Sequence, residues 1–138
     1  MDDGTLLKPA LYRAEGTPQA PSRPALLGGV CARGHVFFPL QPYGCERCGS
    51  VELRPMALSG VGRLLASARV HLHPGKGREA PFTVGAIQLD DGPIVRTLIV
   101  AETPVAAGTR MAASLVRVAD PEGRACLDLR FEPEASAP

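Results

Sequence analysis

Three cysteines and one histidine lie close together in the sequence, at spacings typical of metal ligands. Cys45 and Cys48 form a Cys-x-x-Cys-Gly turn, and Cys31 precedes them with His35 four residues later. Two short turns separated by an extended stretch are typical of a zinc ribbon, in which each turn supplies two of four tetrahedral ligands. Gly34 stands where a second cysteine would complete the usual pattern. We therefore expect the imidazole of His35 to be the fourth donor, with Gly34 relaxing the backbone of the turn.

Two other interpretations of this stretch stay open. The first is a ribbon that has lost its metal and is held together by packing of Phe37, Phe38 and Tyr43. The second is a disulfide between Cys45 and Cys48, although nothing else in the chain indicates secretion. The prediction made here is one zinc ion per chain, bound by Cys31, Cys45, Cys48 and His35.

A second group of candidate residues is basic. Arg69, Lys76 and Arg78 gather around a glycine-containing stretch in which Glu79 is the single acidic residue. Guanidinium and ammonium groups on such a loop can bind phosphates, including those of coenzyme A. The alternative is an ordinary solvated loop, because runs of charge usually have no ligand.

The remaining reactive side chains have simpler explanations. His71 and His73 share one face of an expected strand, but no third ligand stands nearby, which favours surface histidines. Cys126 lies among apolar residues and is expected to be a small core residue. The sequence shows no Ser-His-Asp pattern, no phosphate-binding glycine motif and no paired carboxylates on a helix. We therefore expect no catalytic site on this chain.

Composition limits the partners. The net charge of +1 gives no strong attraction to nucleic acid or to anionic membranes. The N-terminus lacks a signal pattern, and no apolar run approaches the roughly 20 residues that span a bilayer. Four cysteines, three of them at ligand spacing, suit a reducing compartment. These features predict a cytoplasmic protein that does not act on membranes.

Abundant Gly and Pro with few aromatic residues predict a mainly β chain of short strands and turns. We expect an extended and partly helical arm over residues 1–25, with a short helix over Pro9 to Glu15. A zinc ribbon over 26–58 and an OB-fold barrel over 59–133 follow, and the tail 134–138 is expected to fray. The barrel is expected to be a closed, antiparallel sheet of five strands, over residues 61–73, 82–89, 93–101, 110–118 and 124–131.

This arrangement resembles a known family, the small OB-fold proteins with a rubredoxin-like zinc ribbon that were long labelled a domain of unknown function and are encoded beside thiolases. The resemblance covers residues 26–132 in order. It is carried by Leu26-Leu27-Gly28-Gly29-Val30-Cys31, Phe37-Phe38-Pro39, Cys45-Glu46-Arg47-Cys48-Gly49-Ser50, Ser59-Gly60-Val61-Gly62, Ala80-Pro81-Phe82-Thr83-Val84-Gly85, Leu89-Asp90-Asp91-Gly92 and Val105-Ala106-Ala107-Gly108-Thr109-Arg110.

The resemblance implies a non-catalytic subunit that partners a thiolase-superfamily enzyme. Such enzymes make or break carbon–carbon bonds next to a coenzyme A thioester, as in aromatic or steroid degradation, and their catalytic residues lie on the partner. Acyl-coenzyme A is then a ligand of the complex, with Arg69, Lys76 and Arg78 as candidate contacts. The sequence departs from the family pattern at Gly34 and His35.

Two other functions stay open. A single-stranded nucleic-acid binder would need stacking aromatics along a basic groove, whereas the barrel contains only Phe82 and Phe131. A stand-alone acyl-coenzyme A-binding protein is the other. For the subunit hypothesis we expect an exposed apolar surface on the arm and ribbon that binds the partner. Its expected members are Leu6, Leu7, Leu11, Tyr12, Phe37 and Phe38.

Overall fold

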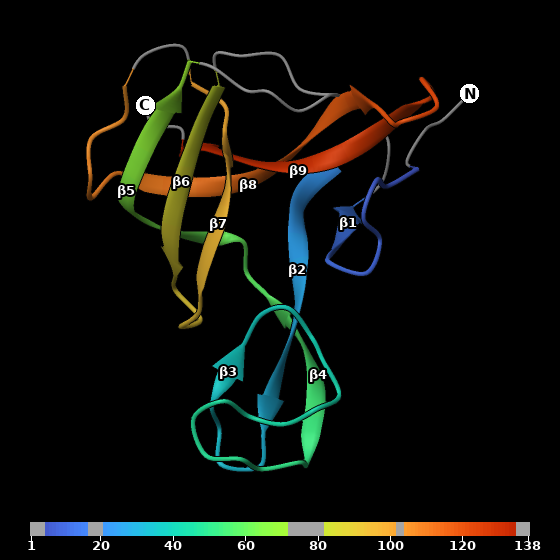
Figure 1. Cartoon of the computed structure of the whole chain (residues 1–138), viewed down its shortest axis with the longest axis vertical. Helices are drawn as coiled ribbons and strands as arrows, with labels where there is room; N and C mark the ends of the chain where they lie inside the picture. Colours follow the sequence, from blue (N-terminus) through green and yellow to red (C-terminus); the bar gives the residue numbers. More distant parts are fainter. Residues whose placement is uncertain (1–4, 17–20, 72–81, 102–103, 135–138) are drawn as a thin grey trace.

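Two β-sheets make up the described part of the chain, residues 5–16, 21–71, 82–101 and 104–134 of a computed structural model. The strands are β1 (Tyr12–Gly16), β2 (Pro21–Cys31), β3 (Val36–Phe37), β4 (Leu53–Leu58), β5 (Val61–Val70), β6 (Phe82–Leu89), β7 (Ile94–Ile99), β8 (Arg110–Ala119) and β9 (Ala125–Pro133). In the first sheet β2 pairs with β1, β3 and β4, and in the second β5-β6-β7-β9-β8 close into a barrel. Figure 1 shows the barrel at one end of the molecule and the small ribbon of β3, β4 and the lower half of β2 at the other.

The mainly β fold and the five-stranded OB-like barrel are confirmed, and the expected antiparallel pairing holds for every neighbouring pair of the barrel except one. β7 and β9 pair in parallel at Ile99 and Phe131, while the other neighbours in the barrel are antiparallel. The reason is one of parity, since five strands in a closed ring cannot all alternate in direction. At least one neighbouring pair must be parallel.

The arm contains a strand where a helix was expected. The helix predicted over Pro9 to Glu15 is wrong, because Tyr12–Gly16 forms β1 and pairs with the first half of β2. Prolines made this region look unstructured, but Pro24 lies at a register shift between β1 and β2, where a missing amide donor is tolerated. Further upstream, the chain pairs with β9: Leu7 N donates to Leu127 O at 2.8 Å and Leu127 N donates to Thr5 O at 2.8 Å.

One continuous core joins the two sheets. Leu26 of β2 and Leu58 of β4 are 0% and 1% exposed and pack with barrel residues such as Leu64, Ile87 and Phe131. The upper end of the ribbon sheet is therefore part of the barrel core, which fixes the ribbon relative to the barrel. The predicted segment boundaries stay a prediction, and residues 135–138 of the expected tail lie outside the described residues.

The expected apolar surface on the arm and ribbon is wrong in its membership. Tyr12 is 1% exposed, and Leu6, Leu7, Leu11, Phe37 and Phe38 are half-buried. The large apolar side chains that are exposed, within the described residues, are Leu40, Tyr43, Val51, Leu65, Ile94 and Val100. The first three of these lie in the ribbon. In the described ranges no helix is long and apolar enough to cross a membrane.

Candidate metal centre

Two similar turns present the candidate ligands. In the first, Cys31 ends β2, Gly34 N donates to Cys31 O at 2.9 Å, and Cys31 N donates to His35 O at 3.0 Å. In the second, Gly49 N donates to Cys45 O at 2.8 Å. Gly34 and Gly49 both have left-handed backbones, with φ of 87° and 77°, which a side chain would strain. The glycine that displaces a cysteine from the first turn thus has a conformational role.

Backbone amides are aimed at two of the sulfurs. Arg33 N donates to Cys31 Sγ and Arg47 N donates to Cys45 Sγ, each at 3.4 Å. Bonds of this kind favour the thiolate over the thiol, because the donor stabilises the negative charge. The turns therefore prepare both cysteines for a cation.

The distances between the candidate ligand atoms fit a tetrahedral ion. Cys31 Sγ and Cys48 Sγ are 3.7 Å apart, and His35 Nδ1 lies 3.5 Å from the sulfurs of both Cys31 and Cys45. All four ligand atoms lie within 4.8 Å of one another. Zinc with bonds of about 2.3 Å to sulfur and about 2.0 Å to nitrogen separates two sulfurs by about 3.8 Å and a sulfur and a nitrogen by about 3.5 Å. The cluster can hold a metal ion of this size, and the donor set suits zinc.

The pKa values of the Cys31 and Cys48 thiols shift in opposite directions. Burial raises the pKa of the Cys31 thiol, but hydrogen bonding with the backbone of His35 and Arg33 and with the neighbouring sulfurs outweighs burial and brings it to about 6. At Cys48 hydrogen bonding with the backbone of Ser50 lowers the pKa, but burial and the nearby Cys31 and Cys45 raise it by more. The sulfurs therefore resist being thiolates together unless a cation lies between them, which is what a divalent metal supplies.

The donor set suits a structural site. Cys31 and Cys45 are buried, Cys48 and His35 are half-buried, and with four protein donors a bound ion would need no other ligand. A zinc site that catalyses keeps one position open for water, whereas a closed four-ligand site holds the fold together. The assignment of these residues as zinc ligands stays a prediction.

The basic residues singled out in the sequence are only partly described. Arg69 is exposed on β5, and its guanidinium donates to Thr83 Oγ1 at 2.9 Å. His71 is also exposed. Lys76, Arg78 and His73 lie outside the described residues. Cys126 is buried in β9 at 3% exposure, as expected of a core residue.

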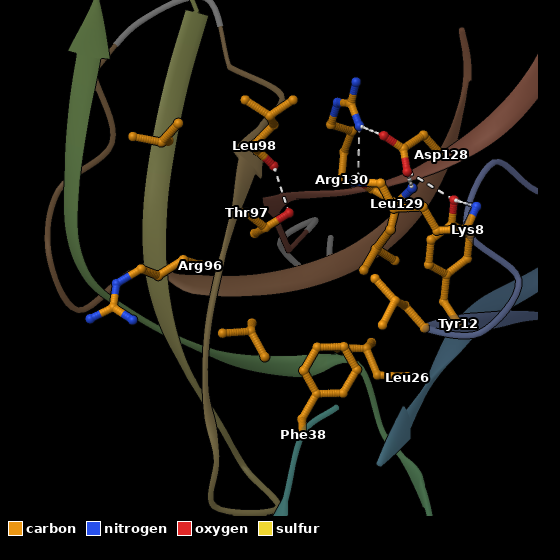
Figure 2. Close-up of a pocket in the computed structure, with 13 residues that line it drawn as sticks. Lys8, Tyr12, Leu26, Phe38, Arg96, Thr97, Leu98, Asp128, Leu129 and Arg130 are labelled. Atoms are coloured by element: carbon orange, nitrogen blue, oxygen red, sulfur yellow. Dashed lines mark hydrogen bonds and ion pairs between the residues drawn. The ribbon is translucent and has the colours of Figure 1, made fainter. Parts of the chain in front are cut away.

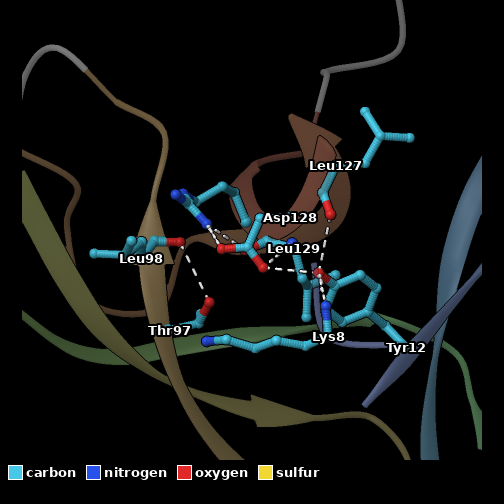
Figure 3. A network of polar contacts seen from close by, with 8 residues as sticks. Lys8, Tyr12, Thr97, Leu98, Leu127, Asp128 and Leu129 are labelled. Atoms are coloured by element: carbon cyan, nitrogen blue, oxygen red, sulfur yellow. Dashed lines mark hydrogen bonds and ion pairs between the residues drawn. The ribbon is translucent and has the colours of Figure 1, made fainter. Parts of the chain in front are cut away.

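A buried polar network was not foreseen from the sequence. The Tyr12 hydroxyl lies 2.8 Å from Asp128 Oδ1 and 3.0 Å from Leu127 O, and with one proton it donates to one of them at a time. Arg130 donates to Asp128 Oδ2 at 2.5 Å (Figure 3 shows Asp128 between its partners). Burial raises the pKa of Asp128, but the bonds from Arg130 and Tyr12 more than reverse this, and the pKa lies below its ordinary value. The sequence feature that could have indicated this network is Asp128, an acidic residue within the otherwise apolar run from Cys126 to Leu129.

Fold and site together define a class: a ribbon with a candidate metal site joined to a five-stranded OB-like barrel. Residues 56–116 match the family described as the C-terminal OB-fold domain of ChsH2. The predicted resemblance to ribbon and OB-fold proteins is therefore confirmed.

Similar proteins agree with this match. A DUF35 domain-containing scaffold protein of Pyrococcus furiosus is 36% identical over 72 residues, which cover 51% of this chain and 52% of that relative. The aligned chain thus spans about half the length of this curated relative.

Two solved structures share the fold. The Ltp2-ChsH2(DUF35) aldolase has a TM-score of 0.63 and 24% identity, covering 79% of this chain and 84% of that one. A protein of unknown function from the DUF35 family of Sulfolobus solfataricus has a TM-score of 0.52 and 17% identity, covering 80% of this chain and 76% of that one. At these identities the likeness concerns the fold.

Proposed function

We propose that this protein is a non-catalytic subunit of a thiolase-like enzyme complex that acts on an acyl-coenzyme A thioester. The observation that carries the proposal is the match of residues 56–116 to the OB-fold domain of ChsH2. The likeness to the Ltp2-ChsH2(DUF35) aldolase extends over 79% of the chain. The relative from Pyrococcus furiosus is itself described as a scaffold protein.

The metal has a structural part in this function. Zinc bound by the two turns would cross-link the end of β2 to the loop before β4. The binding energy of such a site is also folding energy, because the ligands are held in place only in the folded ribbon. The ribbon then offers a rigid surface to a partner.

Exposed apolar side chains on the ribbon support its role as a contact surface. Tyr43 and Val51 are 85% and 75% exposed, and Leu40 is 41% exposed. Exposed aromatic side chains are enriched in protein interfaces, and exposed apolar groups commonly mark them. We call Leu40, Tyr43 and Val51 the ribbon surface.

Contact with coenzyme A is the finer part of the proposal. Arg69 stands near the end of β5, a few residues before Lys76 and Arg78 in the sequence. Replacing Lys76 and Arg78 by Glu should raise the KM of the assembled enzyme for its thioester and leave assembly intact. Unchanged kinetics would show that these two charges do not contact the thioester.

The nucleic-acid alternative has less support. Stacking onto bases needs exposed aromatic rings. Of the large apolar side chains that are exposed in the described ranges, Tyr43 is aromatic, and it lies on the ribbon and not on the barrel.

Co-expression tests the proposal directly. The protein is produced with and without a candidate thiolase-like partner, and thioester-dependent activity is measured for each chain and for the pair. We expect co-elution and activity of the pair only. A fully active lone partner that does not co-elute with this protein would contradict the proposal.

A further inference from the structure

A cavity lies where the arm, the ribbon sheet and the barrel meet. It has a volume of about 440 Å³ and is lined by residues before and in β1, by β2, by the stretch after β3, and by β6, β7 and β9. Figure 2 shows Tyr12, Leu26 and Phe38 on one side of it and Arg130, Thr97 and Leu98 on the other. Pockets of roughly 300 Å³ and more are large enough for small-molecule ligands.

One side of this junction pocket is apolar. Its lining includes Leu11 from the arm, Leu26 from β2, Phe38 from the ribbon and Val95 and Leu129 from the barrel. An aromatic or branched aliphatic group placed here would leave water for a surface built from all three parts of the molecule.

The other side is polar, and its charges do not balance. Both oxygens of Asp128 already have partners, because Tyr12 and the backbone amide of Leu129 donate to Oδ1 and Arg130 donates to Oδ2. Its charge compensates that of Arg130. Two further cations line the pocket, Lys8 and Arg96, and neither forms an ion pair with any residue of the described ranges.

Lys8 and Thr97 face the same space. Figure 3 shows the Lys8 side chain extended toward Thr97 and beneath Asp128. The Thr97 hydroxyl has only a long contact of 3.5 Å with Leu98 O, so it is available to a ligand. Arg96 also lines the pocket, but Figure 2 shows its guanidinium pointing away.

We propose that the junction pocket binds a small monocarboxylate with an apolar body. The carboxylate accepts from the Lys8 amine and the Thr97 hydroxyl, and the apolar body packs against Leu11 and Phe38. Lys8 is the unpaired cation that extends toward Thr97, and its single positive charge matches a monoanion, whereas inorganic phosphate carries more than one negative charge at neutral pH. Neither this site nor its ligand follows from the proposed function, and the inference does not depend on it.

Binding would also stabilise the molecule. A ligand that contacts the arm, Phe38 of the ribbon and the barrel at once binds the folded state and not the unfolded one, which raises the free energy of unfolding. Ligand binding is therefore measurable both as heat and as a rise in Tm.

The test is calorimetric titration of the full, zinc-loaded chain with phenylacetate, benzoate and isovalerate. Phenylacetamide, acetate and inorganic phosphate are the comparison probes. We expect at least one of the three apolar carboxylates to bind and to raise the Tm. Phenylacetamide lacks the charge and acetate lacks the apolar body, so both should bind roughly tenfold or more weakly.

Matched variants locate the binding. Lys8→Met should weaken carboxylate binding by roughly tenfold or more, and Thr97→Val should weaken it by a smaller factor. Arg117→Met removes one positive charge from the exposed face of β8, outside the pocket, and should leave binding unchanged. The proposal is overturned if all three carboxylates fail to bind, if phosphate or phenylacetamide binds as well, or if Lys8→Met and Arg117→Met behave alike.

Discussion

At the scale of single residues, the metal centre depends on side chains that the two turns hold within ligand distance. Sequence spacing was sufficient to predict the set, because all four lie within one short stretch of chain. His35 substitutes for a cysteine one position earlier, and the left-handed Gly34 shapes the turn between it and Cys31. The imidazole reaches further than a thiol, so the extra residue does not prevent a tetrahedral arrangement.

Loss of one ligand should remove the metal. We expect Cys48→Ser to abolish stoichiometric zinc and to loosen the ribbon, since metal binding and folding are coupled there. His35→Ala should weaken zinc binding, and His35→Cys should restore it. Elemental analysis of chelator-free protein measures the content, with Cys126→Ala as a control that removes a cysteine from the barrel. A folded wild-type protein without metal would defeat the assignment.

The Tyr12 network gives a spectroscopic prediction. Burial, followed by the hydrogen bond with Asp128, raises the pKa of Tyr12 from 10.0 to about 12. The sequence contains two tyrosines, so a Tyr43→Phe variant leaves Tyr12 as the sole source of tyrosinate absorbance. We expect its titration to have a midpoint near pH 12 in the folded protein, and a lower one when Asp128→Asn removes the nearby negative charge.

The raised pKa of Tyr12 also makes the stability of the protein depend on pH. The folded state holds the Tyr12 proton more tightly than the unfolded state does. The contribution of this proton to the free energy of unfolding is therefore complete below pH 10 and is lost as the pH rises from 10 toward 12. The difference in free energy of unfolding between the Tyr43→Phe variant and Tyr12→Phe/Tyr43→Phe should shrink over that window. A Tyr12 midpoint near 10 in folded protein would contradict both statements.

At the scale of elements, strands were easier to predict than their partners. The hairpin of β6 and β7 was visible in sequence because apolar alternation and an Asp-Asp-Gly turn are local signals. β1 was missed because the proline-rich segment around it obscured the strand pattern, and its pairing with β2 is what makes Pro24 acceptable. The Tyr12–Asp128 contact was missed for a different reason, since it joins residues 116 positions apart.

The start of β5 shows where an element depends on a glycine. Gly62 is buried, and a Cβ added to it would meet the backbone carbonyl of Gln88 and lie 2.8 Å from Leu89 Cα. Backbone atoms of the paired strand cannot move aside as a flexible side chain can. We expect Gly62→Ala to lower the free energy of unfolding by about 1–3 kcal/mol in urea denaturation.

A neighbouring substitution supplies the control for this prediction. Ser67→Ala changes an exposed residue of the same strand and should alter the free energy of unfolding by less than about 0.5 kcal/mol. Equal effects of the two substitutions would show that β5 and β6 separate easily at this point.

At the scale of the whole molecule, the barrel core and the ribbon surface have different tasks. The core crosses from the ribbon sheet into the barrel through Leu26 and Leu58, so the two parts share buried packing. Sequence reasoning placed the apolar surface on the half-buried and buried residues of the arm and ribbon, because composition alone does not tell which apolar groups find a partner within the chain. The structure instead exposes Leu40, Tyr43 and Val51 of the ribbon.

If the proposed function holds, the ribbon surface should be required for assembly and not for folding. Tyr43→Ser and Val51→Ser together remove the two most exposed large apolar side chains of the ribbon. Because neither residue contributes to the core, we expect the double variant to keep its zinc and its Tm but to bind the thiolase-like partner at least tenfold more weakly, as for interface hot spots. Leu65→Ser and Val100→Ser make an equivalent change on the exposed barrel surface and should leave co-elution intact. Size-exclusion chromatography of the co-expressed pair measures the outcome. Assembly that survives the ribbon variant but fails with the barrel variant would assign the interface to the barrel.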